Sequence, residues 1–293
     1  LWTGSRDAKA GLDQLRSARI PVFYTPDKLA RGLASRLTYH TWRERRLADG
    51  FASTPPRTAS QDEAIAQAVG LGHPTLSESE SKQLLASWGV ESAREHLVGS
   101  AEAAVEAAEQ LGFPVVLKVD SPDILHKTEA GVVRLHLGDA AQVRTAYAEV
   151  LASAKAYAPQ ARITGVSVQE MVRNGIEVIV GVSSDPQLGP VLLFGSGGVM
   201  VEVYNDVALR RCPITRAEAQ AMIAEVKGAR LLRGFRGRPA ADVAALEDTL
   251  VRVSHFAMQM EGRLAELDVN PVMVLPEGQG VKAVDALVVL RGT

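Results

Sequence analysis

Three oxygen-bearing side chains alternate in the segment ELDVN near the end of the chain: Glu266, Asp268 and Asn270. Successive residues of a β-strand point to opposite faces, so this spacing places the three on one face and Leu267 and Val269 on the other. Burying such groups costs free energy unless they meet water or a cation. Carboxylate and amide oxygens suit Mg²⁺, which keeps waters or phosphate oxygens for the rest of its shell.

Asp285 interrupts an otherwise apolar strand, AVDAL, that follows the turn PEGQG. If the two strands pair so that Asn270 lies opposite Asp285, an amide oxygen and a carboxylate face each other and predict a magnesium site. A slip of one residue would place them on opposite faces. The alternative is a solvated sheet face that binds no metal.

A second cluster lies in FPVVLKVDSPDILHKTEAGVV, residues 113–133. Lys118 interrupts an apolar strand, so its ammonium either extends to water or meets an anion at the sheet surface. His126 and Lys127 follow in a polar loop, and we therefore prefer a phosphate site. Imidazole is a good nucleophile at neutral pH, so His126 is a candidate phosphoryl acceptor, although a lone histidine is more often structural.

The glycine-rich stretch GSGGVMVEVYND, residues 195–206, offers backbone N–H groups to an anion, and a tight turn is the alternative. Glu202 and Asp206 lie at its end. Arg210 and Arg211 follow closely, and an arginine pair suits phosphate recognition, although surface exposure explains it equally.

The segment QEMV, residues 169–172, ends a predicted strand where free backbone groups could contact an adenine ring. Glu177 stands among Ile176, Val178 and Ile179. This carboxylate is either an acceptor for a ribose hydroxyl or an outward-facing edge residue.

Residues 1–46 have an αβα pattern, with helix 7–18, strand 20–23 and a helix that begins at Pro26. We predict the end of an α/β domain, and because the chain starts inside this pattern at Leu1 we expect a fragment of a longer protein. Residues 47–75, with a Pro-Pro pair, read as a linker with room for one short helix at 62–69.

A second domain, 76–293, mixes helices with strands. Ser77 and Glu80 form a capping box, and Asn174-Gly175 predicts a hairpin. The predicted helices are 77–88, 100–111, 140–156, 215–232 and 240–260. The predicted strands are one around Lys118, 132–137, 165–172, 177–182, 191–194, one through Glu202, 267–275 and 281–290. Such clustered strands indicate mixed or antiparallel sheets.

The overall composition is that of an ordinary globular chain. The sequence has 293 residues, is 46% hydrophobic and 23% charged, and has a net charge of −2, which gives no nucleic-acid or anionic-membrane footprint. No apolar run approaches the roughly 20 residues needed to span a bilayer. A single cysteine, Cys212, fits a reducing cytoplasm, which we expect as the location.

Several stretches together resemble one family. They are the 113–133 segment, QEMVRNGIEVIVGVSSDPQLGPVLLFGSGGVMVEVYNDVALRRCP, LLRGFRG, ELDVNPVMV and AVDALVVL. They look like the ATP-grasp portion of NDP-forming acyl-CoA synthetases, a group similar to the succinyl-CoA synthetase β subunit. The resemblance implies an α/β (α+β) fold with a two-lobed ATP-grasp domain over 76–293. Residues 1–46 resemble the end of a succinyl-CoA-ligase-like flavodoxin-type domain.

The resemblance implies ATP or ADP and Mg²⁺ as cofactors and a role for each candidate. Lys118 would hold phosphates, with Arg210 near the terminal one. Glu170 and Val172 would lie at the adenine hinge and Glu177 near the ribose. Asn270 and Asp285 would bind Mg²⁺, with Asp268 nearby. His126 would relay a phosphoryl group as phosphohistidine in the reaction acid + CoA + ATP giving acyl-CoA + ADP + phosphate.

The chain lacks the family's CoA-binding domain and the domain with the first phosphohistidine. Those domains are its expected partners, and we expect the fragment alone to be inactive. Two alternatives are an ATP-grasp ligase of another type and a non-catalytic regulatory module of a fused acyltransferase. The residues name neither the acid nor the oligomeric state, and a homo-oligomer is among the states expected.

Overall fold

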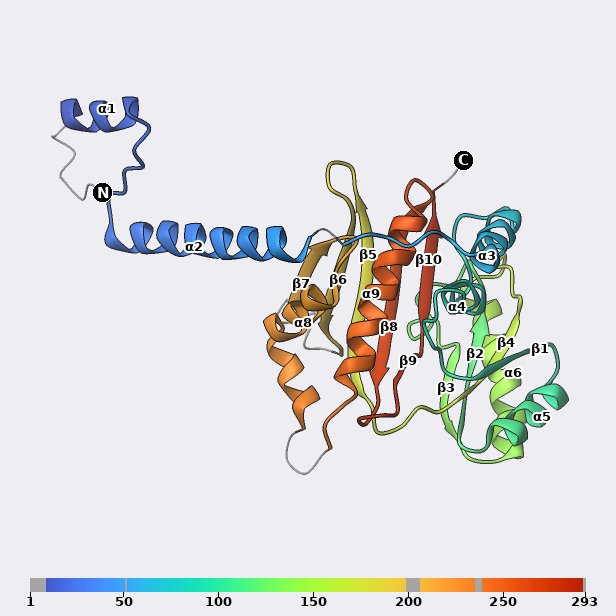
Figure 1. Cartoon of the computed structure of the whole chain (residues 1–293). Helices are drawn as coiled ribbons and strands as arrows, with labels where there is room; N and C mark the ends of the chain where they lie inside the picture. Colours follow the sequence, from blue (N-terminus) through green and yellow to red (C-terminus); the bar gives the residue numbers. More distant parts are fainter. Residues whose placement is uncertain (1–8, 51, 199–205, 235–238, 292–293) are drawn as a thin grey trace. The chain divides into compact units, whose positions relative to one another are not determined.

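The computed structural model describes residues 9–50, 52–198, 206–234 and 239–291 and divides into two compact units, Leu1–Ala52 and Ser53–Thr293 (Figure 1). Within these residues, no helix is both long and apolar enough to cross a membrane.

The first unit contains two helices, α1 (Lys9–Ser17) and α2 (Pro26–Asp49). Pro26 occupies the first turn of α2, where its missing N–H is not needed. The strand expected at 20–23 is absent from this unit, and the segment is an unpaired connection. A strand requires a neighbour to satisfy its backbone groups, and the described part of this unit contains none. The flavodoxin-type assignment of residues 1–46 therefore stays a prediction.

Helix α3 (Ala59–Gly70) lies within the stretch that we expected to be a linker. Thr58 caps it through a reciprocal box with Gln61. Ile65 is only 3% exposed and belongs, with Ala68, to the core of the second unit. The stretch 47–75 is therefore not a uniform linker: its first residues continue α2, and α3 is part of the larger unit.

The second unit is built on two antiparallel sheets, which agrees with the expected mixed architecture. The small sheet has the strand order β1 (Glu95–Val98), β4 (Gly165–Glu170), β2 (Val115–Asp120) and β3 (Val133–Leu137). The large sheet has the order β10 (Ala286–Leu290), β8 (Leu264–Val274), β5 (Ile176–Asp185), β6 (Gly189–Ser196) and β7 (Val207–Arg211), with β9 (Val281–Ala283) also paired to β8. Strands β1 and β7 were not predicted.

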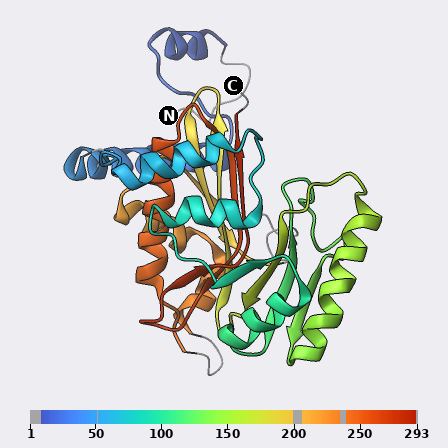
Figure 2. The same cartoon turned by 90° about the vertical axis from the view of Figure 1, so that its right-hand side faces the viewer.

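Helices α5 (Ala101–Leu111) and α6 (Ala140–Tyr157) cover one face of the small sheet (Figure 2). Small residues such as Ala104 and Ala108 on α5 allow this helix to pack closely on the strands. All six residues of β2 are buried, because its other face is covered as well. Lys118 points to that second face, and its ammonium is therefore buried.

The large sheet is covered on one face by α8 (Arg216–Glu225), the 3₁₀ helix η1 (Lys227–Arg233) and α9 (Val243–Gln259). Figure 1 shows α9 lying along this face. Phe194 and Phe256 are fully buried there, and Trp88 packs edge-on against Phe256. Helix α4 (Glu78–Ala86) packs beside β10 and carries the predicted capping box of Ser77 with Glu80.

The dipeptide Asn174-Gly175 does not form the predicted hairpin. Asn174 has the expected positive φ of 61°, but the segment joins β4 of the small sheet to β5 of the large sheet. The dipeptide favours a local change of direction, whereas burial decides which strands pair. The turn therefore forms the link between the two lobes.

The closing strands have the register on which the magnesium prediction depends. Val269 pairs with Ala286 and Val272 pairs with Ala283, so Asn270 lies opposite Asp285. The N–H of Asn270 donates to the carbonyl of Asp285 at 3.2 Å. The strand predicted over 281–290 is interrupted at Val284 and Asp285, between β9 and β10.

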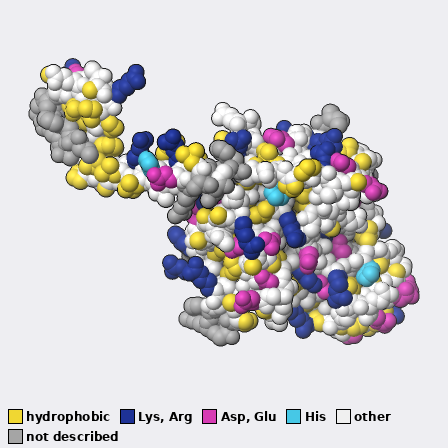
Figure 3. Space-filling view, in the orientation of Figure 1, with side chains coloured by type: hydrophobic (Ala, Val, Ile, Leu, Met, Phe, Trp, Pro, Cys, Tyr) yellow, Lys and Arg dark blue, Asp and Glu magenta, His cyan; other side chains and the backbone are white. Residues whose placement is uncertain are grey.

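The described residues of the second unit form no strongly charged patch on the face shown in Figure 3, and the single thiol is not exposed. Over the visible face of the second unit, basic and acidic side chains are interspersed (Figure 3). Cys212 is buried, and burial raises the pKa of its thiol to about 12.

We expect residues 53–293 to fold alone and residues 76–293 to be less stable by roughly 2–5 kcal/mol, because the second fragment loses the packing of Ile65 and Ala68. Urea unfolding followed by the fluorescence of Trp88 measures the difference. Ile65→Ala in the longer fragment should give an intermediate stability. Equal stability of the two fragments would show that α3 is a linker after all.

Candidate functional site

Three lysine ammonium groups surround one buried carboxylate, that of Glu78 at the start of α4. The side chain of Glu78 is 1% exposed. Its Oε1 accepts from Lys118 Nζ at 2.8 Å and from Lys82 Nζ, and its Oε2 accepts from Lys127 Nζ at 2.6 Å. The lysines come from β2, from α4 itself and from the loop 121–131, so this contact joins three segments distant in sequence.

The charges in this cluster stabilise one another. Burial alone would raise the pKa of Glu78, but Lys118, Lys127 and Lys82 more than offset that effect and lower it. Burial likewise tends to lower the pKa of Lys127, and the carboxylates of Glu78 and Asp285 reverse this and raise it. Glu78 and Lys127 therefore stay ionised in the folded protein.

The carboxylate of Glu95 neutralises Lys82, the third lysine of the cluster. Lys82 Nζ also donates to Glu95 Oε2 at 2.8 Å. The hydroxyl groups of Ser79 and Ser167 each donate to Glu95 at 3.0 Å. Lys82 is thereby held by Glu78 and Glu95. Lys118 and Lys127 instead extend toward the large sheet, where they contact Val284 and Asp285.

Asp285 lies beside these two lysines. Lys127 Nζ is 3.1 Å from its Oδ1 and 3.3 Å from its Oδ2, and Lys118 Nζ is 4.0 Å from its Oδ2. Burial and Glu78 raise the pKa of Asp285 above its ordinary value despite the two lysines. The structure thus brings Lys118, expected to hold phosphates, next to Asp285, expected to bind Mg²⁺.

Glu266, Asp268 and Asn270 share one face of β8, as the alternation predicted, while Leu267 and Val269 are buried on the other. Burial, Asp285 and Glu266 raise the pKa of Asp268 to about 6. Clustered carboxylates with raised pKa values favour a cation.

This donor set of two carboxylates and one amide fits Mg²⁺. Within the described ranges, no three acidic, His or Cys side chains form a ready-made metal cage. Such a site would therefore rely on water and phosphate oxygens for the remaining ligands.

Gln169 brings a buried amide to the same place. Its Nε2 and Lys118 Nζ each donate to the carbonyl of Val284 at 3.0 Å. Gln169 is fully buried, and its Oε1 has no hydrogen-bond partner among the described residues. The break between β9 and β10 frees the Val284 carbonyl to accept these two bonds.

The predicted adenine and ribose contacts lie along the link between the sheets. Glu170 ends β4, and its carboxylate accepts from Arg94 Nε at 2.8 Å and from Lys282. Val172 follows in the half-buried link. Glu177 is exposed on β5, opposite Met273, and a Cβ on Gly197 would lie 2.7 Å from its backbone. Glycine at 197 thus permits β6 to approach Glu177 closely.

The structure does not bring Arg210 to this group. Arg210 lies opposite Leu192 in the sheet, and the cross-strand neighbours continue through Val182 to Leu267. These residues lie on the helix-covered face of the large sheet. There, Arg210 Nη2 donates to Glu225 of α8 at 2.8 Å. The row of Arg211 leads instead through Val191 to Ser183 and Glu266, on the face of Asp268. Of the two arginines, Arg211 therefore shares the candidate face.

The glycine-rich stretch is seen only in part, because residues 199–205, including Glu202 and the strand expected through it, lie outside the described residues. Asp206 has a structural role: its carboxylate accepts from the N–H groups of Lys227 and Gly228 at 2.9 and 2.7 Å. It thus caps the start of η1.

His126 is exposed on the loop 121–131, directly before Lys127. Sequence reasoning noticed Lys127 only as its neighbour and gave Glu78 no role. One signal was available: Glu78 and Lys82 are four residues apart on a helix that begins with a strong cap, so they lie on one face. Their burial could not be seen without the fold.

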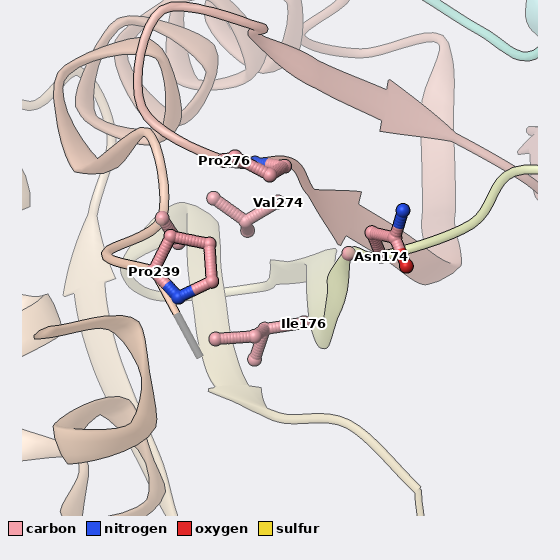
Figure 4. Close-up of a pocket in the computed structure, with 7 residues that line it drawn as sticks. Asn174, Ile176, Pro239, Val274 and Pro276 are labelled. Carbon is pink, nitrogen blue, oxygen red and sulfur yellow. The ribbon is translucent and has the colours of Figure 1, made fainter. Parts of the chain in front are cut away.

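A separate hollow of about 430 Å³ lies at the end of the link between the lobes, between Asn174, Ile176, Pro239, Val274 and Pro276 (Figure 4). Among the described residues that line it, none is charged. Ile176 and Val274 belong to the helix-covered face of the large sheet, opposite to Asp268. This hollow is therefore distinct from the charge cluster.

Comparison with known protein families gives one match that spans most of the chain. Residues 67–290 match the family model described as an ATP-grasp domain. The chain belongs to the ATP-grasp family. The family predicted from the sequence motifs is thereby confirmed, with a mixed α/β fold and two antiparallel sheets.

Relatives of this ATP-grasp chain are ADP-forming acyl-CoA synthetases. It is 38% identical to the β subunit of acetate–CoA ligase [ADP-forming] II of Pyrococcus furiosus over 228 residues, 78% of this chain and 97% of that protein. It is 40% identical to acetate–CoA ligase [ADP-forming] I of Archaeoglobus fulgidus over 269 residues, 91% of this chain but 38% of the relative. The chain therefore spans well under half of that longer enzyme.

A solved structure of the dinucleotide-forming acetyl-coenzyme A synthetase 1 of Ca. Korarchaeum cryptofilum is also similar, with a TM-score of 0.68 and 37% identity. The similarity covers 79% of this chain and all of that chain. That structure holds coenzyme A and Mg-AMPPCP, with a phosphohistidine segment that points towards its nucleotide-binding site.

We expect Glu78→Gln to destabilise this ATP-grasp chain by about 3–5 kcal/mol at neutral pH, because the lysines lose their shared buried counter-charge. The pKa of Glu78 is lowered in the folded state, so its contribution is present above the ordinary value of 4.5 and is lost as the pH falls below it. The difference from wild type should therefore shrink in acid. Urea unfolding at several pH values measures it, with exposed Glu109→Gln as the control. A difference that is constant with pH would contradict the assignment.

Proposed function

We propose that this chain is the nucleotide-binding and phosphoryl-transfer part of an ADP-forming acyl-CoA synthetase, which joins a carboxylic acid to CoA with conversion of ATP to ADP and phosphate. The main support is the convergence of Lys118, Lys127 and Asp285 in one place between the two sheets. Two ammonium groups beside a carboxylate that can hold a divalent ion form the charge pattern that a metal-bound polyphosphate requires.

The proposed nucleotide contacts follow the two sheets. Lys118 binds phosphate oxygens, and the backbone of Glu170 and Val172 contacts the adenine edge. Glu177 accepts from ribose hydroxyls. Support for Glu177 is its place on the Asp268 face of the large sheet. Arg210 is not retained in the proposal, because it is paired with Glu225 on the opposite face.

Asn270 and Asp285 are the proposed protein ligands of Mg²⁺, with Asp268 beside them. The opposed register of Asn270 and Asp285 and the raised pKa values of both aspartates support this assignment. When bound, Mg²⁺ would neutralise and orient the nucleotide phosphates. The relative from Ca. Korarchaeum was solved with Mg-AMPPCP, which is consistent with this ligand.

His126 is the proposed phosphoryl carrier on this chain. A neutral imidazole nitrogen would attack the terminal phosphorus of ATP, and the bond to the bridging oxygen would break with its electron pair leaving on ADP. Exposure of His126 on its loop would allow the phosphoryl group to pass to a partner. CoA-binding and phosphohistidine domains, supplied by the same protein or by another subunit, are the proposed partners.

Removal of the proposed metal ligands should separate metal-dependent from metal-independent binding. We expect Asn270→Ala with Asp285→Ala to weaken Mg·ATP binding by roughly 100-fold but not to weaken metal-free ATP binding. Lys118→Met should weaken both. Isothermal calorimetry measures the affinities, with Arg210→Met as the control away from the site. Unchanged Mg·ATP binding in the double variant would remove the metal assignment.

Phosphoryl transfer to His126 is tested by incubation with Mg²⁺ and ATP labelled at the γ position. We expect an acid-labile, base-stable label on the wild-type chain and none on His126→Asn, because a phosphohistidine is hydrolysed in acid and is stable in base. His136→Asn, which alters a neighbouring histidine on β3, is the control. A label that persists in the His126 variant would exclude His126 as the acceptor.

A further inference from the structure

Lys127 already provides a cation at the carboxylate proposed to bind the metal. Its Nζ contacts both oxygens of Asp285, at 3.1 and 3.3 Å, and is held from the other side by Glu78 at 2.6 Å. The side chain of Lys127 is 11% exposed and that of Asp285 33% exposed. A divalent ion bound to Asp285 would therefore lie close to the ammonium group of Lys127.

The two cations are electrostatically incompatible unless anions separate them. A Mg²⁺ ion on an oxygen of Asp285 would lie within a few ångströms of the ammonium, and like charges at that separation repel strongly in a half-buried site. Nucleotide phosphate resolves the conflict, because its oxygens can bind both the ammonium and the metal.

Of the three lysines, Lys127 alone lies on a loop and not on a helix or strand. Lys82 is bound to Glu78 and Glu95 within its own buried layer. Lys118 lies on β2 and is fixed by Glu78 and the carbonyl of Val284. Lys127 lies on the loop 121–131, whose backbone bonds include those from Ala130 N to His126 O and from Val132 N to Lys127 O.

We propose that Lys127 is the counter-cation of Asp285 in the nucleotide-free protein and that it exchanges Asp285 for nucleotide phosphate when Mg·ATP binds. Glu78 is the pivot that retains the ammonium during the exchange. Because His126 directly precedes Lys127, the exchange also repositions the backbone of His126. The inference rests on the proposed function and assigns to Lys127 a positioning role at the same site.

The proposed exchange predicts that removing the charge of Lys127 strengthens the binding of a metal ion alone and weakens the binding of metal-free ATP. Lys127→Met keeps the side-chain length and removes the charge. We expect it to bind Mn²⁺ without nucleotide roughly ten-fold more tightly than wild type, because Asp285 is no longer occupied. It should bind metal-free ATP roughly ten-fold more weakly, because a phosphate contact is lost. Electron paramagnetic resonance measures free Mn²⁺, and calorimetry measures ATP binding, both on the full 293-residue chain.

Lys155→Met, on the exposed surface of α6, is the matched control and should change neither affinity. Lys127→Arg retains the charge and should bind Mn²⁺ as weakly as wild type, which keeps the test decisive if the methionine variant is unstable. Hydrogen exchange of residues 121–132 should change on addition of Mg·ATP in wild type and much less in Lys127→Met.

Equal or weaker Mn²⁺ binding by Lys127→Met, or tighter binding by Lys127→Arg, would overturn the proposal. Failure of the proposed function has a different signature: the wild-type chain would not bind Mg·ATP at all. The nucleotide-free Mn²⁺ comparison still reports the Lys127–Asp285 contact in that case, so the two failures can be told apart.

Discussion

The arrangement of the second unit depends on one buried carboxylate, that of Glu78. A buried anion is tolerated only where opposite charges and hydrogen bonds replace its water, and here three ammonium groups do so. Lys118 and Lys127 extend from this carboxylate to the strand break at Val284 and Asp285. The contact therefore ties the small sheet and its loop to the large sheet. It also holds positive charge in place, which water-exposed lysines would do poorly because of their flexible side chains.

The features predicted correctly from the sequence are those that local physics determines. The cap of α4 requires only a serine at the right place before a helical pattern. The shared face of Asp268 and Asn270 requires only the two-residue period of a strand. The opposition of Asn270 and Asp285 was left open, because a slip of one residue in the pairing would have separated them. The local features were sufficient to mark the strand face on which the metal site is proposed.

The features that were wrong or missed depend on contacts between distant segments. Asn174-Gly175 makes the turn its residues favour, but the partners of β4 and β5 are set by two separate cores. The short helix expected at 62–69 is present as α3, but its place in the core depends on the burial of Ile65, which the local pattern does not show. Arg210 and Arg211 are adjacent, and only the register of β7 against β6 decides which one faces the site. Glu78 has the sequence context of an exposed helix start, and its role depends on lysines 40 and 49 residues away.

The buried state of Cys212 has a practical consequence. A thiol with a pKa of about 12 and no access to solvent is almost entirely in its unreactive form at neutral pH. Cys212 is therefore expected not to react with maleimides or with thiol-directed spin labels. A single cysteine introduced on the loop that carries His126 would react selectively, so its movements could be followed spectroscopically without prior removal of the native sulfur.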